Sequence, residues 1–106
     1  MIKREHTGNP AAEAAALSQA IAESLAELNL ILPLCEGEAL DAIDFQVSLL
    51  EDANLVAPCW HMINNHASAD GAWSATLSIL IKNHLARALD LTALRDLVLG
   101  KLHGGQ

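Results

Sequence analysis

The stretch NPAAEAAALSQAIAESLAELNLIL, residues 9–32, decides the fold. It opens with Asn9, which suits an N-cap, followed by Pro10 at the first helical position and Glu13 in the first turn. Apolar side chains then recur at steps of three and four residues, which is typical of one face of a helix. They are Ala14, Leu17, Ile21, Leu25, Leu28 and Leu32. The sequence therefore predicts an amphipathic helix that ends or kinks at Pro33, because the residue before a proline avoids the α conformation.

A second helix is predicted to start near Glu38. Its apolar stripe consists of Leu40, Ile43, Val47 and Leu50 and then reaches Asn54. Pro58 interrupts the pattern, and two interpretations stay open. Either the helix ends at Ala57, or it continues with a kink through Ile63; the spacing of the next apolar residues favours the kink.

The C-terminal half predicts one or two more helices. Asp70 is the expected cap of a third helix, whose stripe runs from Trp73 to Leu91 and includes His84. Thr92 either caps a short fourth helix or lies inside the third, and the preference of threonine for caps favours a break. With no strand signal, we predict an all-α fold, a small up-and-down bundle of three to four helices. Residues 9–102 are expected to form a single domain, with flexible tails at 1–8 and 103–106.

The composition indicates closely packed helices and more apolar surface than the core of the chain buries. Apolar residues make up 52% of the chain, yet Phe45, Trp60 and Trp73 are its only aromatics. We therefore expect a homodimer or another protein partner to cover part of the surface. No apolar run approaches the length that spans a membrane, and no secretory signal is visible, so we expect no membrane partner and a cytoplasmic location. Cys35 and Cys59 are then expected to be reduced.

The charge is unevenly distributed along the chain. Residues 1–53 carry ten acids against Lys3 and Arg4, a net charge of −8, whereas residues 54–106 carry three acids against four bases, a net charge of +1. An acidic half repels phosphate groups, which argues against direct nucleic-acid binding.

The stretch PCWHMINNH, residues 58–66, is the candidate for chemistry. On a continuous helix, Cys59 and His61 diverge by about 200° and His61 and His66 by about 140°. The side chains therefore do not converge on one metal ion as zinc requires. No orienting third group and no glycine-rich phosphate loop can be named, so we predict neither catalysis nor a cofactor. The alternative is a small-ligand or metal-binding bundle that uses Cys59, His61, His66 and His84.

The leading prediction from the sequence is a non-enzymatic protein-interaction module, which would act as a regulator, an adaptor or a phage-type inhibitor. Aromatic side chains and an acidic helix face are its expected interface. The interface residues are Phe45, Trp60, Trp73, Asp41, Asp44, Glu51 and Asp52. Asn54 and His84 lie on predicted apolar stripes, where a polar side chain can set the pairing register or make association pH-sensitive.

Overall fold

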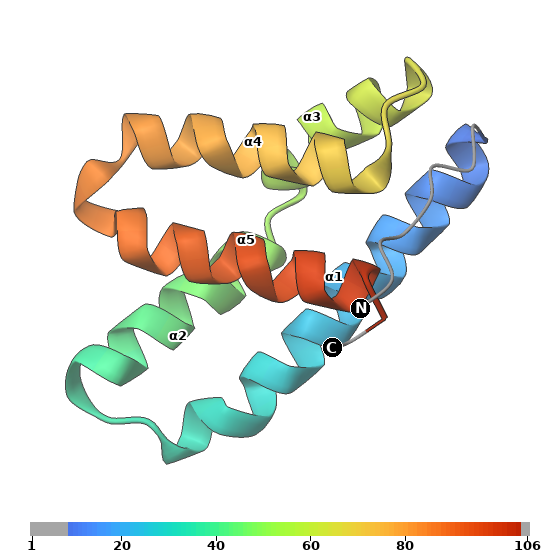
Figure 1. The fold of residues 1–106 in the computed structure, drawn as a ribbon. Coiled ribbons are helices and arrows are strands. Elements are labelled where there is room, and N and C mark those ends of the chain that lie inside the picture. The colour runs from blue at the N-terminus through green and yellow to red at the C-terminus, as the bar shows by residue number, and fades with distance from the viewer. Residues whose placement is uncertain (1–8, 105–106) are drawn as a thin grey trace.

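A computed structural model describes residues 9–104, which form five α-helices and two short 3₁₀ segments (Figure 1). In chain order these are α1 (Pro10–Ile31), η1 (Leu32–Leu34), α2 (Gly37–Leu50), α3 (Ala53–Asn64), α4 (Ala69–Asn83), η2 (Leu85–Arg87) and α5 (Ala88–Leu102). The all-α class is confirmed, but the helices number five rather than three to four.

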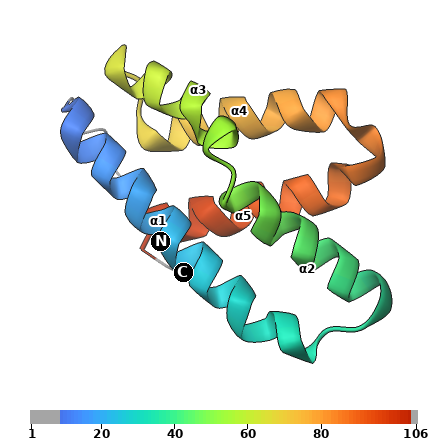
Figure 2. The same ribbon diagram turned by 180° about the vertical axis from the view of Figure 1, so that it is seen from behind.

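The helices form two hairpins that cross one another. The α1–α2 hairpin opens as a V, and α4 and α5 run antiparallel beside each other (Figures 1 and 2). Helix α5 lies over the α1–α2 hairpin and contacts α1, α2 and α4. Helix α3 packs along the other side of α4. The crossing angle between the hairpins makes this a less regular arrangement than a simple up-and-down bundle.

The break after the second helix comes earlier than the sequence pattern indicates. Helix α2 ends at Leu50, and Asp52 caps α3 by accepting the backbone N–H of Asn54 at 2.9 Å. Pro58 lies inside α3, so the chain stays helical through this proline. Neither interpretation of the second helix holds, because this helix ends at Leu50, before both Ala57 and Pro58, and the residues through Ile63 belong to a separate helix, α3.

The second half also divides differently from the prediction. Ser68, not Asp70, caps α4, because its hydroxyl accepts the N–H of Gly71 at 3.0 Å. The predicted stripe from Trp73 to Leu91 is cut at His84, which lies between the end of α4 and the start of η2. Thr92 lies inside α5, so it caps nothing. The break before α5 was expected near residue 92 and falls about five residues earlier.

The core lies where α1, α4 and α5 meet. Its largest fully buried side chains include Leu17 from α1, Trp73 and Leu77 from α4, and Leu94 and Val98 from α5. Every core helix thus contributes leucine, valine or tryptophan, as the amphipathic stripes predict.

Two polar contacts join the core helices. The indole N–H of Trp73 donates to the backbone oxygen of Arg95 at 3.2 Å, which links α4 to α5. The fully buried Glu13 accepts the backbone N–H of Ala69 at 2.8 Å, which links α1 to the start of α4. Buried polar groups need such partners, so both contacts fix how the helices are placed.

The predicted N-terminal tail, residues 1–8, lies outside the described residues. At the other end, His103 follows α5 in a turn and pairs with Asp70, so this part of the predicted C-terminal tail is held against α4. Of the described helices, none combines the length and the apolar character needed to cross a bilayer.

Candidate functional site

The best-defined surface feature lies where the turns of the two hairpins approach each other. We call the exposed parts of residues 30–44 and 85–90 the tip surface. Its first segment covers the end of α1, η1 and the start of α2, and its second covers η2 and the start of α5. These segments are far apart in sequence, and side-chain contacts between α2 and η2 hold them together.

Arg87 makes most of these contacts. Its guanidinium donates to Asp41 at 2.8 Å and to Asp90 at 3.0 Å. It also lies 4.3 Å from the ring centroid of Phe45, within the range of a cation–π interaction. The hydrogen bond to Asp41, and then that to Asp90, raise the pKa of Arg87 above its ordinary value. Gln46 adds a hydrogen bond to the backbone oxygen of Asp90 at 2.8 Å.

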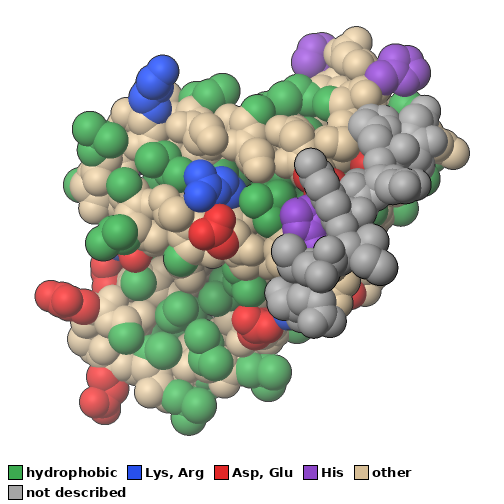
Figure 3. Space-filling view, in the orientation of Figure 1, with side chains coloured by type: hydrophobic (Ala, Val, Ile, Leu, Met, Phe, Trp, Pro, Cys, Tyr) green, Lys and Arg blue, Asp and Glu red, His purple; other side chains and the backbone are tan. Residues whose placement is uncertain are grey.

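Large apolar side chains are exposed on both segments of the tip surface. Leu34 is 82% exposed, Leu85 73% and Leu89 88%. Leu30, Ile31 and Leu40 add further exposed apolar area. Hydrophobic side chains gather over the α1–α2 hairpin and over the turn before α5, with acidic side chains between them (Figure 3). Exposed apolar groups collected at joined turns are typical of a surface that another molecule covers.

The tip surface is strongly acidic. It contains five carboxylates against the single guanidinium of Arg87, a net charge of −4. The carboxylates belong to Glu36, Glu38, Asp41, Asp44 and Asp90. Such a surface attracts cationic groups and repels phosphate.

The three aromatic residues predicted for an interface differ in how far they are buried. Trp73 is fully buried and is a core residue that offers a partner no surface. Trp60 and Phe45 are half-buried, and Phe45 lies under Arg87 beside the tip surface. With only three aromatics in the chain, the sequence did not distinguish the tryptophan that fills the core.

The predicted acidic residues are all exposed, but they do not form one patch. Asp41 and Asp44 belong to the tip surface, and Asp41 is engaged by Arg87. Glu51 and Asp52 lie at the opposite end of α2, where Asp52 caps α3. The structure therefore brings two of the four predicted acids to the tip surface.

Asn54 and His84 do not occupy the core-facing positions assigned to them. Both are exposed, because the helices break close to each of them. Asn54 lies in the first turn of α3, and His84 follows the last residue of α4. The apolar stripes that appeared to include them end one turn or less before these positions.

The cysteine and histidines of residues 58–66 are not brought together. Cys59 is fully buried, whereas His61 and His66 are exposed at the end of α3. His84 lies at the far end of α4. Within residues 9–104, no three His, Cys, Asp or Glu side chains are arranged to hold a metal ion. The Cys59 thiol instead donates to the hydroxyl of Thr76 at 3.3 Å, so it joins α3 to α4.

Cys59 is expected to resist modification in the folded protein. Burial raises the pKa of its thiol, an effect that the hydrogen bonds of the thiol with Thr76 and with the backbone only partly oppose, and a buried thiol reacts poorly. We expect a thiol reagent to modify the half-buried Cys35 and to reach Cys59 only after denaturant is added. Mass spectrometry of the labelled chain measures this directly. In a Cys35→Ser control, labelling under native conditions at the rate seen in denaturant would contradict the buried position of Cys59.

Three sets of contacts that organise the structure were not recognised from the sequence. Arg87 gave only a weak signal, an acid three residues later at Asp90. Glu13 was recognised as a first-turn acid but not as a buried acceptor for α4. The pair of His103 with Asp70 joins residues 33 positions apart, which no local pattern indicates.

Comparison with known proteins places the chain in a family. The sequence matches the family described as "PEP-utilising enzyme, N-terminal" over residues 2–91, which is 90 of its 106 residues. No curated protein and no solved structure matches it. The match contradicts the function predicted from the sequence: neither a non-enzymatic regulator, adaptor or phage-type inhibitor nor a ligand-binding bundle built on Cys59 and the histidines agrees with it.

Proposed function

The chain belongs to the family of PEP-utilising enzyme N-terminal domains, and on that premise we propose that it works in phosphoenolpyruvate-dependent phosphoryl transfer, as a helical domain of a phosphotransferase-system protein. Its part in the transfer is to bind the protein that carries the phosphoryl group, and the tip surface is the contact. The observation that carries this proposal is the family match, whose residues 2–91 include the whole tip surface. The cytoplasm is the compartment that we propose for this activity.

The chemistry of the tip surface supports binding of a protein rather than of the phosphoryl group itself. Phosphoryl groups in transfer are stabilised by cations and backbone N–H donors. A surface with a net charge of −4 provides the opposite environment. A carrier protein that presents both apolar and basic side chains complements it, because exposed leucines and carboxylates occur together on the tip surface. The homodimer inferred from the sequence would use the same leucines and would compete with this partner.

The proposal is tested by following phosphoryl transfer and binding together. The immobilised chain is incubated with host extract and phosphoenolpyruvate labelled in its phosphoryl group. We expect it to retain a protein that carries the label. The double variant Asp41→Lys with Asp44→Lys should retain about tenfold less of it, since charges at the rim of an interface act mainly on association.

Glu23→Lys is the matched control, because Glu23 is an exposed acid on α1 outside the tip surface. It should retain the labelled protein as the unmodified chain does. Retention of unlabelled proteins alone would contradict the proposal. So would label on the chain itself, which would make this protein a phosphoryl carrier.

A further inference from the structure

The only cation of the tip surface is already engaged by carboxylates. Within residues 30–44 and 85–90 this cation is Arg87. Its guanidinium donates to Asp41 at 2.8 Å and to Asp90 at 3.0 Å. Two carboxylates thus surround one guanidinium, so the cluster as a whole is negatively charged and does not attract a phosphoryl group. The nearest other cation in the sequence, Lys82, lies in the last turn of α4, outside the tip surface.

Three further carboxylates of the tip surface act directly on whatever binds there. They belong to Glu36, Glu38 and Asp44, which are all exposed. Among residues 9–104, no ion pair joins any of the three to a basic side chain. Exposed leucines, such as Leu34 and Leu89, belong to the same surface. A partner that covers these leucines removes water and salt ions from the area, and the carboxylates are then less well screened.

We propose that the tip surface binds the unphosphorylated carrier protein more tightly than the phosphorylated one. This inference rests on the proposed function and adds how the contact with the carrier is regulated. Phosphorylation gives the carrier about two negative charges. In the complex these charges lie near a surface with a net charge of −4, which repels them. The carrier therefore dissociates more readily once it bears the phosphoryl group.

Coulomb's law gives the expected size of this difference in affinity. For a phosphoryl group about 10 Å from the centre of the tip surface, in the dielectric constant of water and with a screening length of about 8 Å, the repulsion weakens binding about fivefold. In about 1 M salt the screening length falls to about 3 Å, and the two states of the carrier should bind almost equally. This dependence on salt separates repulsion between charges from a change in packing.

The carrier retained from host extract is the probe that tests the inference. Its phosphorylated and unphosphorylated states are bound separately to the whole chain, and surface plasmon resonance measures both affinities in about 0.15 M and about 1 M salt. We expect the unphosphorylated state to bind about fivefold more tightly in the lower salt only, a difference that still allows the labelled carrier to be retained from extract. Equal affinities in the lower salt, or tighter binding of the phosphorylated state, would overturn the inference and leave the proposed function standing. Retention of no carrier in either state would overturn both.

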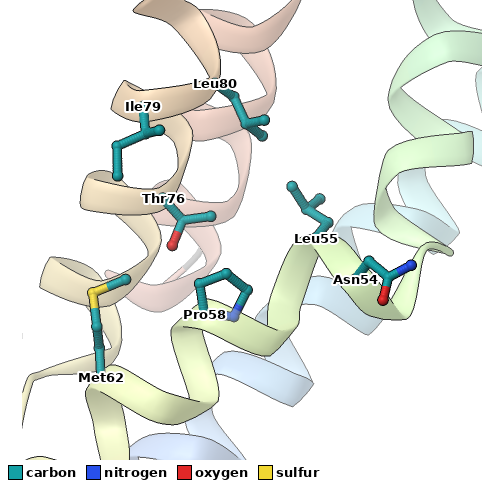
Figure 4. A pocket seen from close by; sticks show the side chains of 7 residues that line it. All are labelled: Asn54, Leu55, Pro58, Met62, Thr76, Ile79 and Leu80. Carbon is teal, nitrogen blue, oxygen red and sulfur yellow. The ribbon is translucent and has the colours of Figure 1, made fainter. Parts of the chain in front are cut away.

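Three variants separate the charges of the tip surface from its apolar contacts. Glu38→Gln combined with Asp44→Asn removes half of the net charge and should reduce the difference between the two states to about twofold. Leu89→Ser, at a leucine that is 88% exposed, should weaken both states alike and keep the difference between them. Ile79→Ser is the matched control, because Ile79 is also exposed but lines the separate opening between α3 and α4 (Figure 4), so both affinities should stay unchanged. An undiminished difference in the double charge variant would overturn the inference.

Discussion

Replacing Trp73 with alanine is expected to lower the free energy of unfolding by about 3–5 kcal/mol, the usual cost of removing a buried aromatic side chain. Trp73 is fully buried, and its indole ring packs in the core that α1, α4 and α5 share. The substitution also removes the hydrogen bond to the backbone oxygen of Arg95. Because small domains have only about 5–15 kcal/mol of stability in total, the variant should be partly unfolded at moderate urea concentrations.

Urea unfolding followed by circular dichroism measures this loss, since the described chain is almost entirely helical. Trp73→Phe is the matched control: it keeps an aromatic ring but removes the N–H donor. It should cost less than the alanine variant, about 0.5–1.5 kcal/mol for the lost hydrogen bond plus the cost of a small void. A loss below about 1 kcal/mol for Trp73→Ala would show that the ring is not a core residue.

Trp73 also illustrates what the sequence could and could not predict. Its stripe on α4 was correctly recognised as amphipathic, and the all-α class followed from such stripes. The neighbours of a tryptophan are not encoded in its own helix, however. Leu94 and Val98, which line the same core, come about 20 residues later and reach it only because α5 turns back along α4. An interface role and a core role could therefore not be separated by periodicity.

Helix ends were predictable where one local signal stood alone. Asn9 precedes Pro10 and no competing cap is near, and the structure places the start of α1 there. Around residue 52 two signals predict different helix ends. Asp52 can cap a new helix, whereas Pro58 predicts a break six residues later. The break at His84 has neither glycine nor proline beside it, so no local signal in the sequence marks it.

Only part of the tip surface could be predicted from the sequence. Its acids were recognised on α2, but the two segments meet through a contact between Asp41 and Arg87, which are 46 residues apart. The functional error has a related origin. The scarcity of catalytic side chains led to the prediction of a non-enzymatic regulator, adaptor or inhibitor, whereas the family match places the chain among PEP-utilising enzyme N-terminal domains. A domain that binds a carrier protein needs complementary surface, not catalytic groups, and composition cannot distinguish the two cases.

Replacing Glu13 with alanine is the second change expected to lower the free energy of unfolding substantially. Its carboxylate is fully buried and accepts the first backbone N–H of α4, from Ala69, at 2.8 Å. The first N–H groups of a helix have no partner within the helix, and the positive end of the helix dipole favours a carboxylate there. Glu13→Ala leaves this N–H buried without its acceptor. We expect a loss of about 2–3 kcal/mol in the free energy of unfolding, near the upper range for an unsatisfied buried group.

Where Glu13→Ala loses stability in the chain is as informative as the size of the change in unfolding free energy. Hydrogen exchange should show the amide of Ala69 losing protection in Glu13→Ala, while amides in the middle of α5 lose only what the global destabilisation requires. Glu13→Gln keeps a side-chain oxygen and should retain much of that protection. Glu23→Ala removes an exposed acid from the same helix and should change stability by less than about 0.5 kcal/mol. Equal exchange of the Ala69 amide in Glu13→Ala and Glu23→Ala would mean that the start of α4 is held by its other contacts, such as the Ser68 cap, and not by Glu13.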